Sequence, residues 1–175
     1  MSASTIHHLA ERRLTELGIA LPAFPMPVAD YVPFTISGNL LFISGQGPRT
    51  VDEKYMTGKV GRDVTADEAY AHARLVGINL LSVVHHAQNG LSMVRRVVKL
   101  TGFVNASDDF RDHPKVINGC SDLLVEVFGD AGRGDRLQTA LRRNRRGDFQ
   151  VRLEVERNCN HGLSTLAYIF TTPVC

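Results

Sequence analysis

The sequence has few cysteines, little excess charge and no apolar stretch of membrane-spanning length. Its three cysteines (Cys120, Cys159 and Cys175) are odd in number and widely spaced, which fits neither a disulfide framework nor a zinc-binding motif. The formal net charge of +2 gives no reason to expect an obligatory acidic partner. Residues 1–11 lack the basic and apolar regions of a secretory signal. These absences predict a cytoplasmic protein with free thiols and no membrane partner.

The length of 175 residues and a hydrophobic content of 43% are those of one globular domain with a substantial core. Residues 1–30 are expected to form an N-terminal helix and a proline-rich connector. Residues 31–156 form the main domain, and residues 157–175 form an atypical C-terminal tail.

Two long amphipathic helices are the clearest predicted elements. The first begins at a capping box over residues 65–68 and ends at Asn89-Gly90. The second begins near Asp112 and Pro114 and ends at Gly129. A shorter helix is expected from Ser4 or Thr5 to about Leu17, ending at Gly18.

Four strands are predicted, over residues 34–36, 40–44, 95–105 and 149–156. The unbroken apolar run at residues 40–43 is typical of a strand that is covered on both faces. In the third strand, alternation places Val98, Leu100, Gly102 and Val104 on one face. The element order predicts an α+β sandwich of one sheet and two helices.

Ser44 and Gln46 follow the apolar run at residues 40–43, at the end of a strand where side chains can meet a ligand. Gly38-Asn39 and Gly45 supply the backbone freedom to enter and leave that strand. This stretch resembles the signature of the Rid family (reactive intermediate deaminases, also called YjgF-like or endoribonuclease L-PSP proteins), in its longer branch with an N-terminal helix. Further matching pieces are Tyr31-Val32-Pro33, residues 58–61, residues 97–104, Asn118, residues 129–133 and residues 153–156.

The resemblance implies a chorismate-mutase-like fold with one mixed sheet, assembled as a homotrimer with ligand clefts between subunits. It also implies hydrolysis of reactive enamines and imines derived from amino acids, with no metal or organic cofactor. The substrate would be a small molecule that carries a carboxylate.

Carried over residue by residue, the family's site falls on two catalytic and three substrate-binding positions. Arg136 would clamp the substrate carboxylate, since a guanidinium binds it through two parallel hydrogen bonds. Glu154 would position the attacking water and accept its proton. Tyr31 would line the cleft, Ser44 would bind the polar end of the substrate, and Asn118 would support it.

The sequence departs from the family pattern after Arg136. Residues 137–148 are basic and non-alternating, and they are about three residues longer than the pattern requires. This composition predicts that no clean strand lies beside the guanidinium, which would disturb the active site.

Several structural readings remain open beside these functional ones. Arg136 could be one of a run of solvated arginines, or that run could contact RNA phosphates, although nucleic acid is the less expected partner. Glu154 could pair with Lys99 across the strands. Ser44 and Tyr31 could satisfy backbone groups, and Asn118 could bond within the fold.

Other polar residues carry no functional prediction. His85, His86 and His113 lack further ligands at metal spacing, and Cys120 lies on the apolar stripe of its helix. Two further functions stay open: a non-catalytic trimeric ligand-binding or stress protein with a decayed site, and an RNA-binding or endoribonuclease-like protein.

Overall fold

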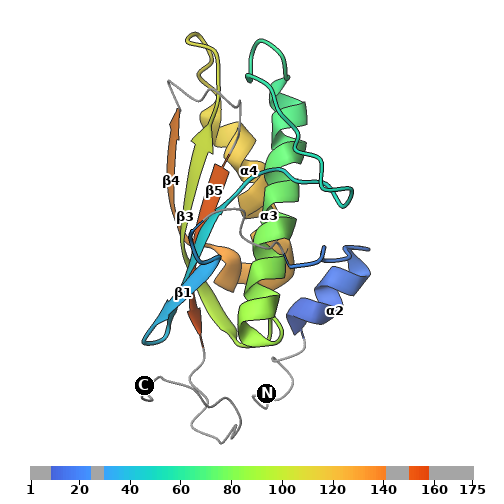
Figure 1. Ribbon diagram of the computed structural model, residues 1–175, viewed down its shortest axis with the longest axis vertical. Coiled ribbons are helices and arrows are strands. Elements are labelled where there is room, and N and C mark those ends of the chain that lie inside the picture. The colour runs from blue at the N-terminus through green and yellow to red at the C-terminus, as the bar shows by residue number, and fades with distance from the viewer. Residues whose placement is uncertain (1–8, 25–29, 141–149, 158–175) are drawn as a thin grey trace, which may run out of the picture.

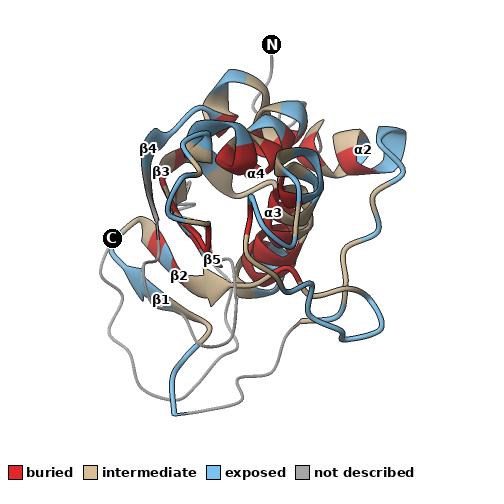
Figure 2. Ribbon diagram, turned by 90° about the horizontal axis from the view of Figure 1, so that it is seen from above, coloured by how far each residue is buried: buried red, intermediate tan, exposed pale blue. Residues whose placement is uncertain are grey.

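The computed structural model describes residues 9–24, 30–140 and 150–157. One mixed sheet has the strand order β1-β2-β5-β3-β4, in which β3 and β4 are parallel and all other neighbours are antiparallel. Two long helices cover one face of this sheet (Figures 1 and 2). The elements in chain order are α2 (Leu9–Glu16), β1 (Phe34–Ser37), β2 (Leu40–Gln46), α3 (Ala66–Gln88), β3 (Val94–Val104), α4 (His113–Phe128), a 3-10 turn (Gly129–Gly132), β4 (Asp135–Ala140) and β5 (Gln150–Arg157).

The predicted capping box of α3 is confirmed. The Thr65 hydroxyl accepts from the Glu68 backbone N–H at 3.2 Å, and the Glu68 carboxylate accepts from the Thr65 backbone N–H at 2.8 Å. Asn89 ends the helix in the left-handed conformation, with φ 54°. α4 also begins where expected, with proline in its first turn, although the Asp112 side chain makes no capping hydrogen bond.

The two long helices cross at very short range. A methyl group on Gly119 of α4 would lie 2.0 Å from the carbonyl oxygen of Tyr70 on α3. On the outer side of the crossing, Arg74 pairs with Glu126 at 2.6 Å and Tyr70 donates to Asp122 at 3.0 Å. The crossing fixes α4 over the far end of the sheet, where β3 and β4 lie.

The short N-terminal helix α2 is tied to the helix layer by polar contacts. The Glu11 carboxylate accepts from the backbone N–H groups of Leu91 and Ser92, at 2.6 and 3.0 Å. Arg13 donates to the carbonyl of Val127 at 3.2 Å. The expected caps at Ser4 and Thr5 lie outside the described residues.

The prediction that no clean strand lies beside the guanidinium is wrong for residues 137–140, and residues 141–148 lie outside the described part of the chain. β4 contains Arg136, and it pairs in parallel with β3 from Lys99↔Asp135 to Val104↔Ala140. Because β4 is an edge strand, it forms through backbone hydrogen bonds to β3 and needs no alternating apolar side chains. The predicted strand order therefore lacked one strand.

Two predictions about strand faces are also corrected. Val97, and not Val98, lies in the core with Leu100, since a β-bulge opposite β5 shifts the alternation at this point. In β2, Leu41 and Ile43 are buried, but Phe42 between them is 37% exposed. The sheet is therefore covered on its helix face only, and its second face is open in the single chain. In the described part of the chain, no helix combines the length and apolar character needed to cross a membrane.

Candidate functional site

The open face of the sheet carries a hollow of about 580 Å³, which we call the sheet-face hollow. It collects three of the five predicted site residues, Tyr31, Ser44 and Glu154. Its full lining is Tyr31, Thr35, Phe42, Ile43, Ser44, Gly45, Arg152 and Glu154. Residues more than a hundred positions apart in the sequence meet here because β5 lies beside β2 in the sheet.

A bulge in β2 shapes this hollow. Ile43 pairs with Leu153 and Gln46 pairs with Val151, so two residues, Ser44 and Gly45, stand opposite the single residue Arg152. Bulges bend a strand and are frequent beside active sites, where they redirect side chains. The end of the bulged segment is held from behind by Asn79 of α3, which donates to the carbonyl of Gly47 at 3.1 Å.

Ser44 holds the segment that carries Tyr31. Its hydroxyl donates to the carbonyl of Val32 at 2.6 Å, and its backbone N–H donates to the carbonyl of Pro33 at 2.9 Å. Tyr31 itself is 47% exposed at the rim of the hollow. The Ser44 hydroxyl oxygen keeps lone pairs that can accept from a ligand, so its structural role leaves the predicted binding role possible.

Glu154 has no ion pair within the part of the chain that the structure describes. Lys99 is its register partner on β3, yet no salt bridge joins the two side chains. The neighbouring carboxylate on the same face behaves differently, since Glu156 pairs with Arg95 at 2.8 Å and with Arg96 at 3.5 Å. The Glu154 carboxylate is thus half-buried in the hollow and available for a ligand or a water.

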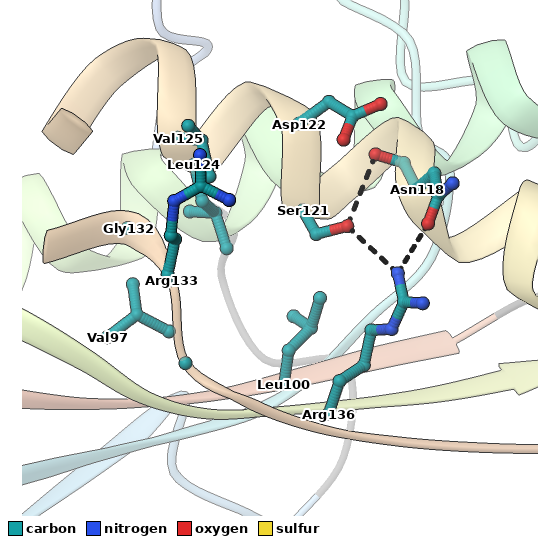
Figure 3. Close-up of a pocket in the computed structure, with 11 residues that line it drawn as sticks. Val97, Leu100, Asn118, Ser121, Asp122, Leu124, Val125, Gly132, Arg133 and Arg136 are labelled. Atoms are coloured by element: carbon teal, nitrogen blue, oxygen red, sulfur yellow. Dashed lines mark hydrogen bonds between the residues drawn. The ribbon is translucent and has the colours of Figure 1, made fainter. Parts of the chain in front are cut away.

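The other two predicted residues meet in a second pocket, between β4 and α4, which we call the guanidinium pocket (Figure 3). It has a volume of about 280 Å³. Arg136 rises from β4 toward α4 and donates from Nη1 to the Asn118 side-chain oxygen at 2.5 Å and to the Ser121 hydroxyl at 3.2 Å. The remaining lining residues are Val97, Leu100, Asp122, Leu124, Val125, Gly132, Arg133 and Gly134.

The Arg136 guanidinium is held only by neutral groups among the described residues. Asn118 and Ser121 fix its orientation without neutralising its charge, whereas the nearby Arg133 pairs with Asp130 at 3.3 Å. A positioned, exposed guanidinium without a carboxylate partner is suited to bind an external carboxylate. Ser121 was not predicted, although it lies three residues after Asn118 and therefore on the same helix face.

The sheet separates these two groups within one chain. Arg136 is the register partner of Leu100, whose side chain is buried beneath the helices. Glu154 is the register partner of Lys99 and Phe42, on the opposite face. Since successive residues of a strand point to opposite faces, the guanidinium and the carboxylate project in opposite directions. Within the described part of one chain, the two predicted catalytic groups therefore do not meet.

The other titratable groups among the described residues form no second candidate centre. Burial raises the pKa of the Cys120 thiol to about 12, so it stays protonated and is not a nucleophile. His86 stacks on Phe24, with ring centroids 3.8 Å apart. Within residues 9–24, 30–140 and 150–157, no group of three or more His, Cys, Asp or Glu side chains is placed to hold a metal ion.

This protein has a chorismate-mutase-like α+β fold. Two long helices cover one face of a mixed five-stranded sheet, which has a parallel pair of strands at one edge. A model of the family described as "YjgF/chorismate mutase-like, putative endoribonuclease" matches residues 11–142. The chain belongs to this family.

Individual relatives extend the match over most of the chain. The chain is 42% identical over 117 residues to Protein TCP17 of Trypanosoma cruzi, covering 67% of this chain and 73% of that protein. Among solved structures, a protein of unknown function from Agrobacterium tumefaciens is 41% identical with a TM-score of 0.79, covering 89% of this chain and 97% of the other. A "putative endoribonuclease" from Shewanella oneidensis is 34% identical with a TM-score of 0.80, covering 84% and 98%.

Proposed function

We propose that this protein is a hydrolytic deaminase of amino-acid enamines and imines, with its sites at the seams of a homotrimer. The observation that carries the proposal is the division of the site between the two faces of the sheet. Among the described residues, a guanidinium without a carboxylate partner lies in one pocket, and a carboxylate without an ion-pair partner lies in the other. A neighbouring copy could bring its guanidinium pocket against the sheet-face hollow, so that the two half-sites complete each other.

In such a site, Arg136 would bind the substrate carboxylate. Asn118 and Ser121 engage Nη1, which leaves the rest of the planar fork for the two carboxylate oxygens. Fixing the carboxylate also fixes the adjacent C=N carbon, which is the atom that water attacks. Orientation of this kind can supply several kcal/mol of the barrier reduction, about 7–11 kcal/mol in the best intramolecular cases.

Glu154 would then act as the general base. Its carboxylate accepts a proton from the water as the water oxygen bonds to the carbon of the protonated imine, which gives a neutral carbinolamine. That proton then passes to the nitrogen, and the C–N bond breaks as the carbinolamine hydroxyl gives its own proton back to Glu154, which releases ammonia and leaves a 2-oxo acid. An enamine enters the same path after protonation at carbon, which converts it to the imine.

Ammonia release from a freshly generated enamine of serine tests the proposal. Arg136→Ala should abolish the catalysed rate while the oligomer stays intact by size-exclusion chromatography with light scattering. Arg12→Ala provides a matched control, because Arg12 is an exposed arginine on α2 that pairs with Glu16 of the same helix. Full activity of Arg136→Ala would rule out the clamp.

The wild-type chain and the Arg136→Ala variant also distinguish catalysis from ligand binding without turnover. If the wild-type chain binds pyruvate in an Arg136-dependent way and releases no ammonia, the protein is a ligand-binding relative whose chemistry has been lost. If it neither binds nor turns over, the deaminase proposal fails.

A further inference from the structure

Arg152 lies in the sheet-face hollow, and the proposed reaction does not use it. It is exposed on β5, two residues before Glu154 and on the same face of the strand. No hydrogen bond or ion pair joins it to another described residue. The two arginines at the start of β3 differ from Arg152, because Arg95 and Arg96 pair with Glu156.

The guanidinium of Arg152 is nevertheless held in place. Its Cζ lies 5.7 Å from the centroid of the Phe103 ring, a distance at which a cation is attracted to an aromatic face. Stacking on one face leaves the N–H groups at the guanidinium edge free to donate. The bulge at Ser44 and Gly45 opens space directly opposite this side chain.

Closing the hollow with a neighbouring copy would bury this charge. A guanidinium removed from water is costly unless a partner of opposite charge accompanies it. Among the described residues that line the hollow, Glu154 carries the only carboxylate, and the proposed reaction requires that carboxylate to receive a proton from water. A second acidic group of the ligand would supply the counter-charge for Arg152.

We infer that Arg152 binds a second acidic group of the substrate, so that the preferred substrates are imines and enamines with two carboxylates, such as the imine of glutamate. This inference rests on the proposed function, in which Arg136 takes the first carboxylate. The two guanidinium groups balance the dianion and leave Glu154 free as the base. Hydrolysis adds water across C=N and releases ammonia and a dicarboxylic 2-oxo acid.

Matched substrates of five carbons test the inference. The imines of glutamate and of norvaline, generated in the assay by amino-acid oxidases, differ only in the second carboxylate. Arg152→Gln should lower kcat/KM for the glutamate imine about 10- to 100-fold, as expected for loss of one charged hydrogen-bonded contact. The loss should fall mainly on KM, and the norvaline imine should be unaffected. Arg152→Lys should restore part of the loss, and Arg96→Gln, on the same sheet face, should change neither rate.

Binding measurements distinguish failure of this inference from failure of the deaminase proposal. Calorimetry with 2-oxoglutarate and 2-oxopentanoate reports the second carboxylate without any turnover. If the wild-type chain turns over neither imine but binds 2-oxoglutarate more tightly, and Arg152→Gln removes the difference, the acidic subsite stands and the deaminase fails. If Arg152→Gln weakens both substrates equally, or neither, Arg152 does not read the second carboxylate, and the inference is overturned while the deaminase stands.

Discussion

Mixing two inactive variants should restore activity. Arg136→Ala removes the guanidinium, and Glu154→Gln removes the proton acceptor without changing side-chain size. Arg136 faces α4 and Glu154 faces the open side of the sheet, so one chain cannot bring them together. In a cyclic assembly, each seam would take its arginine from one protomer and its glutamate from the neighbour.

The fraction of activity recovered follows from the fraction of seams that contain both intact side chains. With equal amounts of the two variants in randomly assembled oligomers, about a quarter of the seams combine a normal arginine with a normal glutamate. A second mixture, of wild-type chain with the Arg136→Ala/Glu154→Gln double variant, should also give about a quarter of the wild-type rate. If the site instead lay within one chain, the first mixture would give none and the second about half.

The assay is ammonia release at fixed total protein after the chains are unfolded and refolded together. Distinguishable affinity tags on the two variants verify that mixed oligomers form. Each variant refolded alone provides the background. No recovery in the first mixture, together with half activity in the second, would refute the argument that the site crosses a seam.

Three further outcomes are expected. Gly119→Ala should lower the free energy of unfolding by about 1–3 kcal/mol or more, because the new methyl group meets the Tyr70 backbone carbonyl, which cannot rotate away. Denaturant unfolding measures this change, and an unchanged midpoint would contradict the close crossing of α3 and α4. Burial lowers the pKa of His72 and of His113, so the folded state disfavours their protonation. The free energy of unfolding should therefore fall as the pH drops below the pKa of an unfolded histidine, about 6.5. A Tm that stays level from neutral to mildly acidic pH would contradict this prediction. Labelled RNA should not be retained at low salt in a mobility assay, because Arg133 pairs with Asp130 and Arg136 is held by Asn118 and Ser121, while the arginines at residues 142–146 lie outside the described part of the chain. Salt-sensitive retention would favour the RNA-binding alternative.

The helices could be predicted from the sequence because their signals are local. The capping box at Thr65 and Glu68 and the left-handed Asn89 both act within a few residues of the helix ends. The strand β4 could not be predicted in this way. Its residues from Asp135 to Leu137 are exposed, so no alternation of apolar residues marks it, and only its pairing with β3 makes it a strand.

Bulges limited the prediction of strand faces. The β-bulge between Val97 and Lys99 places Val97 in the core instead of the predicted Val98, and nothing in the local sequence marks the position of this bulge. The bulge at Ser44 and Gly45 has the same character, and it opens the hollow opposite Arg152. Arg152 could have been noticed from its spacing of two from Glu154, which places both on one face of β5.

Assembly and chemistry would depend on the same surface of this protein. Phe42 is 37% exposed and Leu137 is 51% exposed on the open face. Phe42 is the register partner of Glu154, and Leu137 lies in the same row as Arg152, with Thr101 of β3 between them. Apolar side chains of this size favour a covered surface, at about 25 cal/mol for each Å² removed from water. A cover supplied by a second copy would exclude water from Glu154 and strengthen its interactions with a bound ligand. A single contact between identical chains would thus account both for the exposed apolar residues and for the separation of Arg136 from Glu154.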